Sequence, residues 1–170
     1  MDITIRPVEP ADIPAIVDFV KEGRLVMFPM LDIESQNQYA QQELAKFQQR
    51  FIDSSHGWFL AAYSNDQLIA TVGYLAYDDR FPKLGLGCEG VVEVVRLFVN
   101  PAWRRAKLAS RLMTMLEERA RQTGIKTLYL HTHPFLDGAI KFWERQGFAI
   151  VGYEDDPFWQ TTHMSKRIAE

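Results

Sequence analysis

Residues 91–148 form the part of this chain that most restricts its fold. Residues 91–99 (VVEVVRLFV) are nearly all apolar and β-branched, which is typical of a buried strand. Pro101 lies just beyond that strand, and an amphipathic helix follows it. Residues 126–131 (KTLYLH) then form a second strand. The unit is long enough for a βαβ crossover, which predicts two parallel strands joined with right-handed sense.

A basic turn lies where the helix of this unit begins, and it contains Arg104, Arg105 and Lys107. The helix starts where the strand ends, so its free N–H groups face the carboxyl end of the sheet and can bind an anion. The three cations indicate that the anion is a phosphate or pyrophosphate. The net charge of the whole chain is -3, so the basic patch is local. We therefore expect a small anionic ligand and no nucleic-acid partner.

The composition predicts one globular domain that spans residues 1–170, because 47% of the residues are hydrophobic. No apolar run approaches the roughly 18–20 residues of a membrane span, and the first residues do not resemble a signal peptide. Cys88 is the only cysteine, which excludes an internal disulfide and suits a reducing compartment. We expect a cytoplasmic protein without a membrane partner.

The remaining elements follow from hydrophobic periodicity and from turn residues. Asn65 and Asp66 form a short hairpin turn between two of the strands. The expected helices cover residues 11–21, 36–51, 104–122 and 134–145, and the expected strands lie near residues 3–5 and at 58–64, 67–77, 91–99, 126–131, 148–153 and 161–168. This order predicts an α/β fold with a mixed sheet and helices on its faces.

Two motifs resemble the GNAT superfamily of N-acetyltransferases. Residues 104–109 (RRAKLA) resemble its pyrophosphate signature, Arg/Gln-x-x-Gly-x-Gly/Ala. Residues 139–148 (AIKFWERQGF) resemble its helix that ends Ala-x-x-Phe-Tyr-x-x-x-Gly-Phe. The resemblance covers essentially the whole chain in element order. It implies a single acyltransferase domain whose mixed, mostly antiparallel sheet has a splayed parallel βαβ core.

The resemblance also implies that acetyl-CoA is the cosubstrate. In the family, backbone groups of the fourth strand hold the pantetheine arm and the thioester carbonyl, and the signature turn holds the pyrophosphate. Carried over to this chain, the implied cofactor-binding residues are Leu97, Phe98, Val99, Arg104, Arg105, Ala106, Lys107, Leu108, Ala109, Ser110 and Trp143.

Three positions depart from the family pattern. Lys107 replaces the first signature glycine, at a place where glycine lets the backbone approach phosphate closely. Trp143 replaces the tyrosine that is often assigned as the acid, and an indole has no proton to give near neutral pH. Leu136 replaces an asparagine that is often found at the start of the last helix. The usual acid is therefore missing.

Acetyl transfer to an amine requires a proton acceptor, since an alkyl ammonium has a pKa near 10.4. Glu93 is the first candidate because it lies within an apolar strand, where burial would raise its pKa. It could equally be a solvated glutamate or form a salt bridge with Arg96 or another cation. His131 and His133 are the other catalytic candidates, since both lie at the carboxyl end of the fifth strand.

Both histidines could instead be hydrogen-bonding loop residues beside the turn at Pro134. Together with His163 they are too loosely spaced to indicate a metal site, so we expect none. The chain is therefore interpreted as an acetyl-CoA-dependent N-acetyltransferase that acts by direct transfer on the primary amine of a small-molecule or amino-acid-like acceptor. The alternatives are a non-catalytic acyl-CoA-binding module or sensor, or a protein or peptide acetyltransferase. The oligomeric state is left open, with a homodimer as one option.

Overall fold

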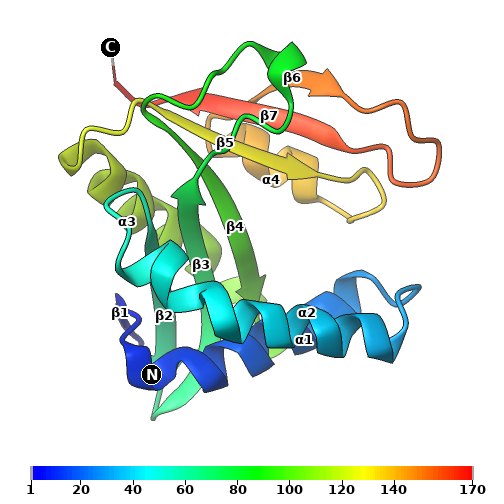
Figure 1. Cartoon of the computed structure of the whole chain (residues 1–170). Helices are drawn as coiled ribbons and strands as arrows, with labels where there is room; N and C mark the ends of the chain where they lie inside the picture. The colour runs from blue at the N-terminus through cyan, green and yellow to red at the C-terminus, as the bar shows by residue number, and fades with distance from the viewer. Residues whose placement is uncertain (1, 170) are drawn as a thin grey trace.

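A computed structural model describes residues 2–169, apart from the side chain of Arg105. Seven strands form one sheet in the order β1-β2-β3-β4-β5-β7-β6 (Figure 1). The strands are β1 (Thr4–Pro7), β2 (Trp58–Ser64), β3 (Gln67–Ala76), β4 (Val91–Val99), β5 (Thr127–Thr132), β6 (Ala149–Tyr153) and β7 (Thr162–Arg167). The helices are α1 (Ile13–Met27), α2 (Ile33–Phe47), α3 (Leu108–Gln122) and α4 (Ala139–Arg145). Within this described part, no helix is both long and apolar enough to cross a membrane.

The sheet is mixed and mostly antiparallel, as predicted. Among the strands of residues 2–169, only β4 and β5 pair in parallel, and α3 connects them as the expected crossover. The hairpin between β2 and β3 turns at Asn65 and Asp66, whose φ angles of 49° and 64° are those of a tight turn between twisted strands.

The parallel pair β4 and β5 is short and then splays (Figure 1). Val91, Val92 and Glu93 pair with β5, whereas β4 itself continues to Val99. The other edge of β4 carries an irregularity where its register against β3 shifts. There Arg96 has a φ of 60°, and its carbonyl oxygen accepts a hydrogen bond of 2.8 Å from the Thr71 hydroxyl. The two strands therefore form a fork that opens just after Glu93.

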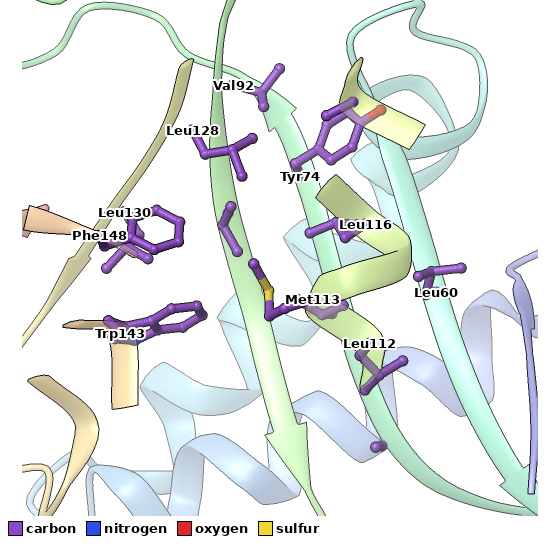
Figure 2. Close-up of a cluster of buried hydrophobic side chains, with 14 of the residues drawn as sticks. Leu60, Tyr74, Val92, Leu112, Met113, Leu116, Leu128, Leu130, Trp143 and Phe148 are labelled. Carbon is purple, nitrogen blue, oxygen red and sulfur yellow. The ribbon is translucent and has the colours of Figure 1, made fainter. Parts of the chain in front are cut away.

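Two hydrophobic clusters cover the two faces of the sheet. α1 and α2 pack on one face, around Phe47, Phe51 and Phe59. On the other face α3 and α4 pack against the sheet, and Figure 2 shows Leu112, Met113 and Leu116 of α3 pointing toward β3 and β4. Burial of such side chains contributes about 1.5–3 kcal/mol each, which holds both arms of the fork in place.

The first two helices differ in their bounds from the prediction. α1 continues past Gly23, which was expected to end it. This glycine does not stop the helix; it lets the helix pack closely against β4. A Cβ atom at Gly23 would lie 2.6 Å from Cδ1 of Phe98 on β4. α2 begins at Ile33 rather than at residue 36, because the Asp32 carboxylate accepts a hydrogen bond of 2.6 Å from the Ser35 N–H and caps the helix.

The last two helices begin later than predicted. Residues Pro101–Ala106 form a 3-10 turn, and Lys107 then adopts the left-handed conformation (φ 54°, ψ 30°), so α3 starts only at Leu108. Pro134 opens a series of turns, and Gly138 with a φ of 75° delays the start of α4 to Ala139.

Candidate active site

Glu93 is the last residue of β4 that pairs with β5, and its side chain is 8% exposed at the fork. One carboxylate oxygen accepts a hydrogen bond of 2.5 Å from Nη2 of Arg80, in the loop between β3 and β4. The other oxygen lies 3.5 Å from Nδ1 of His131 on β5. The structure therefore brings two of the three predicted catalytic residues together, and it adds Arg80, which the sequence did not single out.

The expectation that burial would raise the pKa of Glu93 is wrong. Burial does act in that direction, but the nearby His131 ring and the charge of Arg80 outweigh it and hold the pKa of Glu93 below its ordinary value. Glu93 is thus ionised at neutral pH and paired, as in the salt-bridge alternative, although its partner is Arg80 and not Arg96. A paired carboxylate of this kind is better suited to orient His131 than to take a proton itself.

His131 faces an open depression of about 430 Å³, and its own side chain is 36% exposed. The loop between β3 and β4, the end of β5 and the loop between β6 and β7 form the walls. The lining residues are Phe81, His131, Glu154, Asp155, Asp156 and Thr161. Carboxylates from the last of these loops make the depression negatively charged, which favours a cationic ligand.

His133 is buried and has a different environment from His131. Its Nδ1 is 3.0 Å from the carbonyl oxygen of Trp159, which can only accept, so Nδ1 carries the proton. Burial lowers the pKa of His133 and keeps the ring neutral near pH 7. The ring stacks on Phe135 at 5.2 Å and meets the edge of Phe28 at 5.9 Å. These contacts match the alternative of a hydrogen-bonding structural histidine.

A second buried histidine, His163 on β7, was considered only as a metal ligand at the sequence level. Its Nε2 is 2.8 Å from the Glu154 carboxylate, and its Nδ1 is 2.6 Å from the Tyr129 hydroxyl. The carboxylate can only accept, so Nε2 carries a proton that points to Glu154. In residues 2–169 no group of three or more His, Cys, Asp or Glu side chains is arranged to hold a metal ion.

We predict an anion site at the start of α3. Lys107 precedes the helix in the left-handed conformation, and no described side chain caps the first turn. Arg104 and Lys107 are exposed beside it, whereas the Arg105 side chain lies outside the described part of the structure. Ala106 is exposed, Leu108 is buried, and Ala109 and Ser110 are half-buried. The free N–H groups and the adjacent cations can therefore bind a phosphate group.

The other predicted cofactor residues lie on β4 and α4. Leu97, Phe98 and Val99 are half-buried on the part of β4 beyond the fork, so their backbone is not paired with β5. Trp143 is only 8% exposed and packs edge-on against Phe148, with ring centroids 5.4 Å apart (Figure 2). The indole is part of the core, and contact between these residues and a ligand stays a prediction.

Comparison with known proteins gives one family. The sequence profile of the acetyltransferase (GNAT) family matches residues 24–148. An uncharacterised N-acetyltransferase of Escherichia coli K12, YjgM, is 38% identical over 63 residues, which are 37% of this chain and 38% of that protein. The match thus spans well under half the length of this curated relative.

Solved structures resemble the whole chain. A GNAT-family acetyltransferase of Staphylococcus aureus Mu50 is 17% identical, with a TM-score of 0.77 over 98% of this chain and 99% of the other. The PaiA N-acetyltransferase of Thermoplasma acidophilum, solved in complex with coenzyme A, is 18% identical, with a TM-score of 0.73 over 98% of this chain and 99% of the other. At these identities the likeness establishes the fold, and with it the predicted mixed sheet.

Proposed function

The chain belongs to the GNAT family of acetyltransferases, and we propose that it moves an acetyl group from acetyl-CoA to the primary amine of a small molecule or amino-acid-like acceptor. The single observation that carries this proposal is the fork between β4 and β5, which opens directly beside the Glu93–His131 pair. We also propose that residues 1–170 form one such domain and that it acts in the cytoplasm.

The residues present fit acetyl-CoA. The uncapped first turn of α3, with Arg104 and Lys107 exposed beside it, suits the pyrophosphate. The edge of β4 that faces β5 is unpaired from Leu97 to Val99 and offers hydrogen-bonding groups along the fork to an extended arm. When bound, acetyl-CoA supplies an acetyl group activated as a thioester. Coenzyme A in the PaiA structure supports the same assignment for this fold.

His131 is proposed as the group that takes the proton from the acceptor amine. It faces the open depression, whereas Glu93 is buried behind it and paired with Arg80. Because Glu93 is ionised, it holds the His131 ring in one orientation and stabilises the imidazolium that forms. Trp143 cannot act as an acid, and its burial in the core makes the usual family position unsuitable for that role.

The walls of the depression favour a small cationic acceptor. Glu154, Asp155 and Asp156 attract an ammonium group. Phe28 before α2 and Trp159 before β7 have ring centroids 5.8 Å apart, so these two loops meet near His133.

The test is turnover of acetyl-CoA with a panel of primary amines, followed by release of the free thiol and by mass spectrometry of the products. We expect N-acetylated product with at least one class of small amine, and none without enzyme. A calorimetric measurement of acetyl-CoA binding separates the alternatives. Tight binding without acetylation of any amine would favour the non-catalytic binding module, for which the buried Trp143 in place of an acid is the supporting observation.

A further inference from the structure

The inward faces of α1 and α2 change from apolar to polar toward the loop that joins them. On α1, Ile13, Ile16, Val17 and Val20 are buried, and the next position of this stripe is Arg24. On α2, the stripe that ends in the buried Phe47 contains Gln36 and Glu43, which are 1% and 4% exposed. Polar side chains at core-facing positions need a specific reason, because burying them without partners costs free energy.

Part of this polar cluster is accounted for by the fold. Arg96, the residue with positive φ on β4, donates two hydrogen bonds to Glu43, at 2.9 Å and 3.1 Å. This bidentate pair fastens α2 to β4 at the point where the register shifts. The charge of Glu43 is therefore neutralised by Arg96. A second cation, Nη1 of Arg50, lies 3.8 Å from Oε1 of the same carboxylate.

Among the residues that the structure describes, Arg24 is left as a cation without a carboxylate. Its guanidinium lies 3.9 Å from the centroid of the Tyr39 ring and 5.6 Å from that of Phe28. Its Nε donates to Oε1 of Gln36 at 3.3 Å, and it forms no salt bridge with any carboxylate of the described residues. Arginine stays charged even where burial lowers its pKa, as it does here.

Tyr39 adds a second donor to the same place. Its hydroxyl oxygen is buried and makes no hydrogen bond of normal geometry with the described residues, although the Glu43 carboxylate is close enough to act on its pKa. Burial raises the pKa of Tyr39, so the hydroxyl keeps its proton and can donate. A buried hydroxyl without a partner is rare in native proteins and calls for an explanation.

This cluster is linked by ring contacts to the residues beside His131. Phe28, which contacts Arg24, is also 5.9 Å from His133 and 5.8 Å from Trp159, measured between ring centroids. Arg96, whose guanidinium is 5.5 Å from the centroid of the Tyr39 ring, is three residues beyond Glu93 on β4. Phe28 therefore lies between Arg24 and His133, whose ring centroid is 6.1 Å from that of His131, and we place the far end of the acceptor on the Arg24 side of Phe28.

We infer that Arg24 and Tyr39 bind a carboxylate of the acceptor, so that the acceptor is an amino acid with both an amine and a free carboxylate. This rests on the proposed acetyltransferase function and narrows its substrate class. One uncompensated guanidinium and one hydroxyl match a group of single negative charge. A phosphate carries more charge and oxygens than these donors satisfy. The acidic wall at Glu154–Asp156 then attracts the amine end of the same molecule.

The test compares amino acids with their carboxamides, which keep the amine and lose the charge. Glycine, β-alanine, γ-aminobutyrate, leucine and glutamate vary the distance from amine to carboxylate and the side chain. We expect kcat/KM for the best acid to exceed that of its amide by about ten- to hundredfold, as for a hydrogen bond to a charged group. Arg24→Gln should reduce this ratio to within about threefold, and Tyr39→Phe should reduce it partly.

Controls separate charge from folding. Arg24→Lys keeps the charge and should keep part of the preference, whereas Arg119→Gln, on the opposite face of the sheet beside Trp58, should not change it. If Arg24→Gln does not fold, the ratio of kcat/KM for the acid to kcat/KM for its amide is compared between the wild type and Tyr39→Phe, and this comparison tests the inference. Amides acetylated as well as acids would overturn this inference and leave the proposed function standing. Acetylation of other primary amines but of no amino acid would also overturn this inference alone, whereas acetyl-CoA binding without acetylation of any amine would overturn both.

Discussion

Lys107 occupies the position where the family has glycine. Replacing it tests how this residue affects the stability of the turn before α3 and the affinity for CoA. Its φ of 54° and ψ of 30° lie in the left-handed region, which costs an L-residue roughly 1–2 kcal/mol. Lys107→Gly removes that cost but gives the unfolded chain more freedom, which offsets about 0.5–1 kcal/mol. We therefore expect a variant that is more stable by up to about 1 kcal/mol, with Tm higher by up to roughly 2–4 °C.

The same substitution should leave CoA affinity equal or improved, because glycine lets the backbone approach phosphate and the helix N–H groups remain. Thermal unfolding and calorimetry with CoA measure the two effects. Lys107→Ala is the matched control, since it removes the ammonium and keeps the strained conformation. If both variants lose affinity sharply and equally, the ammonium itself binds the phosphate and our steric reasoning is refuted.

Three further predictions concern other parts of the site. Arg104→Ala combined with Arg105→Ala should weaken CoA binding at least about tenfold by calorimetry, since cations beside the helix start attract the pyrophosphate; unchanged affinity would rule out this placement. Glu93→Gln should destabilise the fold by roughly 1–3 kcal/mol at pH 7. Because the folded pKa of Glu93 is lowered, its contribution to the free energy of unfolding is complete above its unfolded pKa near 4.3 and is lost as pH falls through the folded pKa. The denaturant curves of the wild type and the variant should therefore converge in acid. A difference in stability that persists there would contradict the ion pairing. Trp143→Phe should reduce kcat by far less than a lost general acid would, since the indole only packs in the core; abolished turnover with CoA still bound would show otherwise.

Local patterns in the sequence were sufficient to predict the main elements of the sheet. The apolar strand at Val91–Val99 and the helix after it predicted the parallel crossover, and Asn65-Asp66 predicted the hairpin. Each of these depends on residues that are close in the chain. Helix ends were less predictable. Gly23, for example, is required by close contact with the ring of Phe98, which is distant in sequence, and it does not end the helix.

Partners of the polar side chains could not be predicted, because they come from different elements. Glu43 and Arg96 are 53 positions apart, and Tyr129 and His163 are 34 apart. The lowered pKa of Glu93 likewise depends on Arg80 in a loop. One sequence signal was present and not used: Gln36 and Glu43 interrupt the apolar stripe of α2, which indicates a polar site against that helix.

The most direct test of the proposed site is the turnover number of His131→Ala with the best amine acceptor, with CoA affinity measured separately. We expect kcat to fall by about 10²–10⁴-fold, as for loss of a general base, while CoA binds as in the wild type. His133→Ala, which changes a buried neutral ring, serves as the comparison and should cost less. A His131→Ala enzyme within about threefold of wild-type kcat would contradict the assignment of the proton acceptor at the fork between β4 and β5.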